Sequence, residues 1–133
     1  MTKLNLEDNM LLLIAKKAAE NAYSPYSGYK VGAAVKCSDD NYYDGCNIEN
    51  ASYSLTMCAE RTAIFAAVCS GHKDDMQAIA IYVDSDEAFP PCGACRQVIY
   101  EFNPQMPVIY ANRNTITKTT IGELLPGAFK LKK

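Results

Sequence analysis

The chain has 133 residues, of which 49% are hydrophobic and 21% charged, and it carries a formal net charge of −2 with a pI near 5.3. This composition is that of one globular domain with a buried core, spanning residues 1–133, and it excludes a disordered chain. An acidic chain without a basic cluster argues against a nucleic-acid partner, and no stretch reaches the roughly 18–20 apolar residues that a membrane span needs.

The N-terminal third of the chain predicts one helix followed by two strands. Apolar residues recur at helical spacing on one side of the helix, at Leu11, Ile14, Ala15, Ala18 and Ala22. The turn-forming segment 23–28 ends this helix. Strands are predicted over 29–37 and 42–48, and the short turn between them makes an antiparallel hairpin.

The rest of the chain alternates helices and strands. Helices are predicted from near Cys58 to Gly71 and from 91–95 to about Phe102, and strands over 78–83 and 107–110. The continuous apolar run 78–83 suits a strand that is covered on both faces of its sheet. Thr120 and Glu123 are spaced as a capping box that opens a short last helix, which Pro126 and Gly127 end. This interleaving predicts a three-layer α/β domain.

Two cysteine motifs carry the strongest functional signal. Cys58-Ala59-Glu60-Arg61 and Pro91-Cys92-Gly93-Ala94-Cys95 each stand at the predicted N-terminus of a helix, where unpaired N–H groups and the helix dipole stabilise thiolates. Cys92 and Cys95 are three residues apart and share one face of a helical turn, so they can chelate one ion. A third thiolate from Cys58, with a fourth position open to water, completes the ligand set of a catalytic zinc ion.

Glu60 and Arg61 follow the first cysteine ligand in the chain. Side chains in the first turn of a helix can converge on one pocket, so we expect Glu60 to lie beside the ion and to move protons. Three thiolates give a zinc site a net negative charge, which makes a bound water less acidic than neutral ligands would. We expect Arg61 to offset this charge by donating hydrogen bonds to the ligand sulfurs.

Two other roles for these cysteines stay open. The segment 91–95 resembles a thioredoxin-type redox motif, but such a motif needs neither Cys58 nor Glu60. A structural zinc site is the second possibility, and it would be closed by a fourth Cys or His. Neither role explains the whole pattern, so a catalytic zinc ion is the favoured interpretation.

The remaining cysteines and the single histidine are interpreted as structural. Segment 1–6 lacks the apolar core and cleavage site of a signal peptide, so we expect a cytoplasmic protein whose cysteines stay reduced. Cys37, Cys46 and Cys69 are expected to be small buried packing residues. His72 follows the second helix, roughly 20 Å from its cysteine end at about 1.5 Å of rise per residue. We expect it to be a solvated loop residue.

The two motifs together resemble the three-cysteine form of the zinc-deaminase signature, C-A-E followed by P-C-x-x-C, in which the glutamate is an acid–base group and not a ligand. Blocks over 26–34, 45–51 and 123–129 resemble the cytidine deaminases of the small, homotetrameric type. The resemblance implies a three-layer α/β/α domain with a mixed sheet of about five strands. It also implies one zinc ion per subunit and a homotetramer whose active sites are shared between subunits.

The activity that the resemblance implies is hydrolytic deamination of free cytidine and 2′-deoxycytidine to uridine and 2′-deoxyuridine with release of ammonia, in pyrimidine salvage. Glu60 would take a proton from zinc-activated water, which attacks C4 of cytosine, and would pass protons to N3 and to the departing amine. The expected partner is a free nucleoside, not a nucleic acid or a membrane.

The resemblance also assigns residues to the nucleoside. Asn47 and Glu49 match residues that hydrogen-bond the ribose hydroxyl groups, and their alternation on a strand is expected to place them on the same side. Tyr29 stands where the family usually has Phe packed against the pyrimidine, and its extra hydroxyl needs a partner.

Four further positions follow from the same resemblance. Pro90 stands where the family has Ser or Thr, and it retains the backbone carbonyl that contacts the cytosine amino group. Ala59 matches a residue whose backbone contacts the ring amide of the base. Tyr53 and Phe129 match positions near a site shared with a neighbouring subunit, and a plain interface or core position suits either aromatic equally well.

Three rival functions remain. A blasticidin S deaminase has the same scaffold, but the intact segment 47–50 favours a free nucleoside. An RNA- or DNA-editing deaminase predicts a basic groove and often an added domain. A non-catalytic zinc-stabilised assembly module has no need of Glu60.

Overall fold

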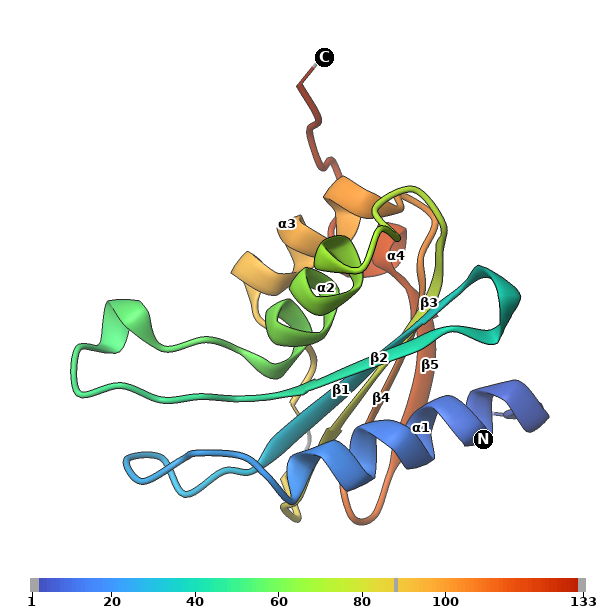
Figure 1. Cartoon of the computed structure of the whole chain (residues 1–133). Coiled ribbons are helices and arrows are strands. Elements are labelled where there is room, and N and C mark those ends of the chain that lie inside the picture. The colour runs from blue at the N-terminus through green and yellow to red at the C-terminus, as the bar shows by residue number, and fades with distance from the viewer. Residues whose placement is uncertain (1–2, 88, 132–133) are drawn as a thin grey trace.

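The computed structural model describes residues 3–87 and 89–131, which form three layers (Figure 1). The middle layer is a mixed sheet with the strand order β2-β1-β3-β4-β5. Its strands are β1 (Val31–Cys37), β2 (Tyr42–Cys46), β3 (Met76–Val83), β4 (Pro107–Ala111) and β5 (Ile116–Thr120). One face is covered by α1 (Leu6–Ala19), and the other by α2 (Ala59–Cys69), α3 (Gly93–Phe102) and α4 (Ile121–Leu124). The predicted three-layer α/β/α architecture is confirmed.

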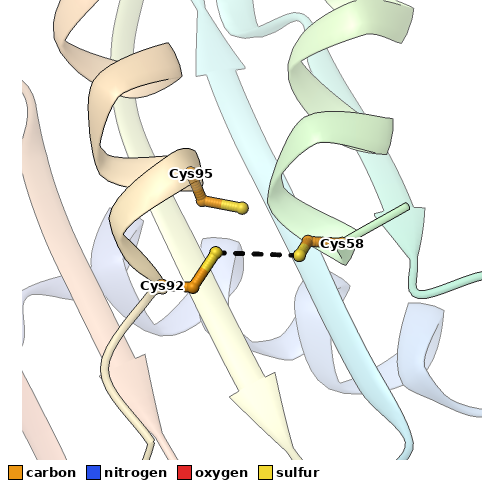
Figure 2. Close-up of side chains that lie close together, drawn as sticks. All are labelled: Cys58, Cys92 and Cys95. Carbon is orange, nitrogen blue, oxygen red and sulfur yellow. Dashed lines mark hydrogen bonds between the residues drawn. The ribbon is translucent and has the colours of Figure 1, made fainter. Parts of the chain in front are cut away.

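The order of the strands brings the two cysteine motifs together. β1 pairs antiparallel with β2 and with β3, β3 pairs parallel with β4, and β4 pairs antiparallel with β5. The parallel pair is connected through α3, as a parallel pair requires a crossover. α2 lies in the connection from β2 to β3, on the same face as α3. The N-termini of α2 and α3 therefore lie side by side (Figure 2).

Alternating side chains on the central strands divide the core in two. Val35 and Ile79 pack in the cluster under α2 and α3, whereas Ala34 and Ala80 pack in the cluster with Leu11 of α1. β3 contributes to both clusters, so the prediction of a strand covered on both faces is confirmed.

Two glycines allow the helices to approach the sheet closely. A Cβ on Gly32 would lie 2.0 Å from the carbonyl oxygen of Ala15 in α1, and a Cβ on Gly45 would lie 2.5 Å from the backbone nitrogen of Ala63 in α2. Neither position has room for a side chain. The second contact fixes the distance of α2 from the sheet, and with it the position of the first turn of α2.

The observed elements depart from the predicted ones mostly at their ends. α1 begins before the first periodic residue because Asn5 and Asp8 form a capping box, with Oδ1 of Asn5 accepting from the Asp8 N–H at 2.8 Å. α1 ends at Ala19, so Ala22 lies beyond it. The box predicted at Thr120 is half formed: Oγ1 of Thr120 accepts from the Glu123 N–H at 3.4 Å. No helix of the described residues combines the length and the apolar character needed to cross a membrane.

Two residues interpreted as structural lie in surroundings that differ from the prediction. Cys69 is exposed, because the last turn of α2 presents it away from the sheet. His72 is not solvated: its side chain is 20% exposed, its Nδ1 lies 2.8 Å from Oδ2 of Asp75, and its ring packs on Tyr43. Gly71, with φ of +93°, turns the chain at the end of α2, and the imidazole that follows contacts Tyr43 of β2.

Candidate active site

Three cysteine sulfurs meet between the first turns of α2 and α3 (Figure 2). Cys58 and Cys92 are the N-cap residues of their helices, and Cys95 lies in the first turn of α3. Sγ of Cys58 lies 3.8 Å from Sγ of Cys92, and all three sulfurs lie within 4.8 Å of one another. Neither N-cap side chain bonds to the backbone of its helix, so the positive ends of both helix dipoles adjoin the sulfurs.

This geometry fits a zinc ion. Sulfurs bound to tetrahedral zinc with bonds of about 2.3 Å lie roughly 3.8 Å apart, which is the separation of Cys58 and Cys92. Cys95 is buried, Cys58 is half-buried and Cys92 is exposed, so the sulfurs span the distance from the core to the surface. Three thiol ligands leave the fourth position of a tetrahedron open, as in catalytic zinc sites.

The surroundings of the sulfurs favour a thiolate at Cys58. A hydrogen bond from Cys95, together with a hydrogen bond and the positive charge of Arg61, lowers the pKa of Cys58 to about 5. The same bond to Cys58, together with burial, raises the pKa of Cys95. The Cys58 sulfur is therefore the one ready to bind a cation, and it accepts a hydrogen bond from the Cys95 thiol.

Arg61 contacts the cluster directly. Its Nη2 donates to Sγ of Cys58 at 3.3 Å, and this bond and the charge of Cys58 raise the pKa of Arg61. The guanidinium therefore stays protonated next to the sulfurs. Thr62 makes a second hydrogen bond to Cys58 in the same turn, since its Oγ1 donates to the carbonyl oxygen of Cys58 at 3.1 Å.

Glu60 is the buried carboxylate of the site. It lies in the first turn of α2 and is only 5% exposed. Burial, aided by the negative charge of Cys58, raises its pKa to about 7. A carboxyl group with this pKa can take up and release a proton near neutral pH.

A cavity of about 310 Å³ opens beside the sulfurs and Glu60. The predicted site residues on its wall are Tyr29, Asn47, Cys58, Ala59, Glu60, Pro90 and Cys92. The other lining residues are Ser27, Val31, Thr56, Met57, Ile81, Val83 and Phe89, which the sequence did not predict. The sequence offered one sign that Phe89 belongs to the site, since this aromatic residue directly precedes the predicted site residue Pro90. Its ring stands edge-on to that of Tyr29, with ring centroids 5.0 Å apart.

The Tyr29 hydroxyl, which the sequence left without a partner, is next to Glu87. The negative charge of Glu87 and a hydrogen bond with it raise the pKa of Tyr29. Glu87 belongs to the loop between β3 and α3, as does Phe89. This loop therefore supplies two contacts to the same tyrosine.

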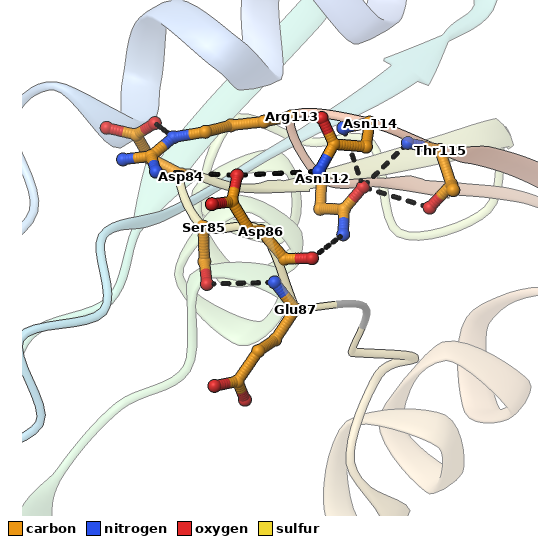
Figure 3. A network of polar contacts seen from close by, with 8 residues as sticks. All are labelled: Asp84, Ser85, Asp86, Glu87, Asn112, Arg113, Asn114 and Thr115. Carbon is orange, nitrogen blue, oxygen red and sulfur yellow. Dashed lines mark hydrogen bonds and ion pairs between the residues drawn. The ribbon is translucent and has the colours of Figure 1, made fainter.

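The turn between β4 and β5 holds that loop in place (Figure 3). Nδ2 of Asn112 donates to the carbonyl oxygen of Asp86 at 3.1 Å, and the N–H of Arg113 donates to the carbonyl oxygen of Ser85 at 3.1 Å. Oγ of Ser85 in turn accepts from the N–H of Glu87 at 3.1 Å. Asn112 is only 6% exposed, so a buried amide anchors one wall of the cavity.

The prediction that Asn47 and Glu49 alternate on a strand is wrong. β2 ends at Cys46. Beyond it, the side chain of Asn47 bonds the Val31 N–H, which would pair with the backbone of a longer strand. Oδ1 of Asn47 accepts from the Val31 N–H at 3.0 Å, and Nδ2 donates to the carbonyl oxygen of Tyr29 at 2.8 Å. Asn47 is 8% exposed and fixes the entry to β1 beside the cavity.

Glu49 lies in an adjoining cavity of about 300 Å³, which Tyr53 also lines, and Ser27 and Thr56 line both cavities. Its carboxylate accepts from the N–H groups of Tyr26 at 2.9 Å and Ser27 at 3.1 Å, and from the Ser27 hydroxyl. The hydroxyl bond is the main reason that the pKa of Glu49 is lowered. Glu49 is thus an ionised group at the edge of the first cavity.

The two remaining predicted residues are on the surface. Tyr53 is 75% exposed and packs edge-on against Tyr26 beside the adjoining cavity. Phe129 is 67% exposed and lines neither cavity, and its carbonyl oxygen accepts from Nε2 of Gln97 at 3.3 Å. Within one chain, Tyr53 lies near the site and Phe129 does not.

Comparisons with known proteins agree with this geometry. Residues 6–112 match the family model described as "Cytidine and deoxycytidylate deaminase zinc-binding region". A cytidine deaminase of Sporosarcina psychrophila is 52% identical over 121 residues, which cover 90% of this chain and 88% of that protein. The crystal structure of cytidine deaminase from Burkholderia pseudomallei superposes with a TM-score of 0.87 at 44% identity, covering 97% of this chain and 100% of that chain. A blasticidin-S deaminase of Bacillus cereus is 33% identical over 135 residues, covering 95% and 96% of the two chains.

Proposed function

The chain belongs to the cytidine and deoxycytidylate deaminase family of zinc-dependent hydrolases, and we propose that its substrates are the free nucleosides cytidine and 2′-deoxycytidine. The products are uridine or 2′-deoxyuridine and ammonia, and the role is pyrimidine salvage in the cytoplasm. The proposal depends on one observation above all. Glu60, Cys58 and Cys92 line one cavity of about 310 Å³, which has the size of a small-molecule site.

Cys58, Cys92 and Cys95 would hold the catalytic zinc ion, one such ion per chain. Their separations and their position at two helix N-termini support this ligand set. When bound, the ion supplies Lewis acidity, which makes a water molecule acidic enough to react near neutral pH.

Glu60 is proposed to move the protons. It takes one proton from the water molecule as the water oxygen attacks C4 of cytosine, and it delivers that proton to N3. It then carries the second proton of the same water to the amino group, and the C4–N bond breaks to release ammonia. Burial of Glu60 supports this role, because a carboxylate shielded from bulk water exchanges protons with the substrate in preference to the solvent.

Arg61 is proposed to lower the negative charge of the three thiolates. Its hydrogen bond to Sγ of Cys58 draws electron density from a ligand. Less charge on the ligands leaves the ion a stronger Lewis acid. Arg61 does not line the cavity, so it acts through Cys58 and not on the nucleoside.

The walls of the cavity suit a pyrimidine. The edge-on pair of Tyr29 and Phe89 provides an apolar wall for a planar ring. We propose that the backbone of Ala59 contacts the ring amide and that the carbonyl oxygen of Pro90 accepts from the amino group at C4. Both residues line the cavity beside the sulfurs.

Asn47 and Glu49 are proposed to bind the ribose. Beyond its two bonds to backbone groups, Asn47 keeps one Nδ2 hydrogen and one Oδ1 lone pair. Glu49 accepts three hydrogen bonds, which leaves one of about four acceptor positions for a sugar hydroxyl. A site built to bond a hydroxyl discriminates strongly against analogues that lack it.

A homotetramer with shared active sites is the proposed assembly. Tyr53 and Phe129 are large exposed aromatic residues, and such residues are enriched in protein interfaces. Tyr53 already adjoins the cavity that contains Glu49, so a neighbouring subunit seated there would reach the ribose end of the site.

An ultraviolet assay of deamination on the purified protein tests the proposal. We expect turnover of cytidine and of 2′-deoxycytidine, loss of turnover with a zinc chelator, and recovery when zinc is returned. Blasticidin S is the control substrate, because one relative of the chain is a blasticidin-S deaminase. Turnover of blasticidin S without turnover of either nucleoside would overturn the proposed substrate and leave the deaminase family intact.

A further inference from the structure

A second group of metal-ligating side chains lies at the opposite end of α2 from the three cysteines. Cys37 is the last residue of β1, His72 follows α2, and Asp75 directly precedes β3. The sulfur, a ring nitrogen and a carboxylate oxygen of these residues all lie within 4.8 Å of one another. His72 and Asp75 belong to the same loop between α2 and β3, and the fold brings Cys37 from the end of β1 to them.

The donor set is one that zinc accepts. Zinc binds thiolate sulfur at about 2.3 Å, imidazole nitrogen at about 2.0–2.1 Å and carboxylate oxygen at about 2.0–2.2 Å, which places tetrahedral ligands roughly 3.3–3.7 Å apart. Nδ1 of His72 and Oδ2 of Asp75, which lie 2.8 Å apart, would separate by roughly 0.5 Å, and no pair of donor atoms exceeds this range by more than about 1 Å. A sulfur and an imidazole together favour zinc over magnesium or calcium, which prefer oxygen ligands.

The carboxylate and the imidazole are already oriented by neighbouring groups. Oδ2 of Asp75 lies 2.8 Å from Nδ1 of His72 and accepts from the Ser38 hydroxyl. Such outer hydrogen bonds fix the direction of a ligand. The imidazole and the carboxylate therefore already face each other.

The site is open on one side. Cys37 is fully buried, whereas the side chains of His72 and Asp75 are 20% and 31% exposed. An ion can therefore enter between the two outer ligands and reach the sulfur, and a water molecule can complete the coordination from the solvent side. The Ser38 bond and His72 lower the pKa of Asp75. Burial raises the pKa of Cys37 to about 11, so metal binding has to release the thiol proton.

We propose that Cys37, His72 and Asp75 bind a second zinc ion, with water as its fourth ligand. The ion joins the end of β1 to the loop between α2 and β3. Both segments lie at the far end of an 11-residue helix from the catalytic cysteines, about 16 Å away at 1.5 Å per residue. The second ion therefore stabilises the fold and takes no part in the reaction.

Zinc content measured after equilibrium dialysis tests the second site. We expect two zinc ions per chain in the wild-type protein, one in Cys37→Ser and one in His72→Ala. The matched control is Cys69→Ser, which removes an exposed thiol of the same helix end and should retain two ions. One ion in the saturated wild-type protein overturns the proposal, as do two ions in both Cys37→Ser and His72→Ala.

Cobalt absorption and thermal unfolding give readouts that do not depend on turnover. The second equivalent of cobalt should add a thiolate-to-cobalt absorption band in the wild-type protein, and His72→Ala should lose that increment. Excess zinc should raise the melting temperature of the wild-type protein but not that of His72→Ala. The zinc-loaded variant should keep the wild-type kcat/KM. The assignment is contradicted if His72→Ala keeps the absorption band of the second cobalt equivalent and zinc raises its melting temperature as much as that of the wild-type protein. This outcome is decisive even if Cys37→Ser does not fold.

Discussion

Nη2 of Arg61 donates to Sγ of Cys58 across 3.3 Å, while Nε of the same guanidinium is buried without a partner among the described residues. A buried donor left unpaired costs about 1–3 kcal/mol. The arginine is thus held at the sulfurs in spite of an energetic penalty. This arrangement is what a charge-balancing role requires, and a packing role would be filled better by an apolar side chain.

Replacing the arginine should separate metal binding from catalysis. In Arg61→Ala we expect zinc to remain bound while kcat falls roughly 10- to 100-fold, since a hydrogen bond to a charged group contributes about 1.5–3 kcal/mol. Zinc content and steady-state kinetics measure the two effects. Arg61→Lys retains the charge without the planar fork and should recover part of kcat. Unchanged turnover in Arg61→Ala would refute the role.

Removing the charge of the buried glutamate should stop the chemistry and leave the site intact. In Glu60→Gln we expect one catalytic zinc ion and near wild-type nucleoside binding, with kcat reduced by about 10²- to 10⁴-fold or more. Equilibrium binding of cytidine and single-turnover rates check this. Glu20→Gln, on the exposed end of α1, is the matched control and should behave as wild type. Retained turnover in Glu60→Gln would exclude Glu60 as the proton carrier.

Glu49 should contribute to stability in a pH-dependent way. Its pKa is lowered in the folded protein, first by the Ser27 hydroxyl, so folding favours the ionised form. The resulting stabilisation is fully present above the ordinary glutamate pKa and is lost as the pH falls through the lowered value. Urea unfolding of Glu49→Gln should therefore show lower stability than wild type near neutral pH and a smaller difference at acid pH. A difference that stays constant across this range would contradict the assignment.

A methyl group on the strand under α2 should disturb the metal site from a distance. In Gly45→Ala the new Cβ would lie 2.5 Å from the backbone nitrogen of Ala63, so α2 must move, and we expect a loss of about 1–3 kcal/mol of stability. Zinc affinity should fall as well, because α2 carries Cys58 at its start. Gly122→Ala meets nothing closer than 3.9 Å and is the control. Equal stability of the two variants in thermal unfolding would show that α2 is not fixed by this contact.

Local sequence patterns predicted most of the fold. α1 to α3 and β1 to β4 carry strong periodic or apolar signals, and each appeared within a few residues of its predicted bounds. β5 was missed, although Ile116–Thr120 is rich in β-branched residues. It lies at the edge of the sheet and buries little apolar surface, so its sequence resembles that of a polar loop. Besides its pairing with β4, it has a long-range contact with α1, from Nζ of Lys118 to Oδ2 of Asp8 at 2.6 Å.

The limits of prediction in the site have a similar cause. The three cysteines and Glu60 could be placed because each follows from a helix start that the local sequence marks. The cavity position of Asn47 was predicted, but its place on a strand was not correct, because its amide bonds the backbone of Val31 and Tyr29 in place of strand pairing. These side-chain hydrogen bonds depend on the geometry of the folded chain, which the periodicity of the sequence does not reveal. Phe89 and the Asn112 anchor were missed for the same reason, since both act between segments distant in sequence.

The positions of Cys58 and Cys92, which are 34 residues apart in the chain, have a consequence for how the protein folds. An ion bridging them closes a loop that contains α2, β3 and the segment leading into α3. In an unfolded chain such a bridge removes loop-closure entropy, as any cross-link does. If the cysteines capture zinc early, the starts of α2 and α3 are joined before β3 and β4 pair. Refolding in the presence of zinc should then be faster than in its absence, and the rate of folding would depend on the same ion that the reaction requires.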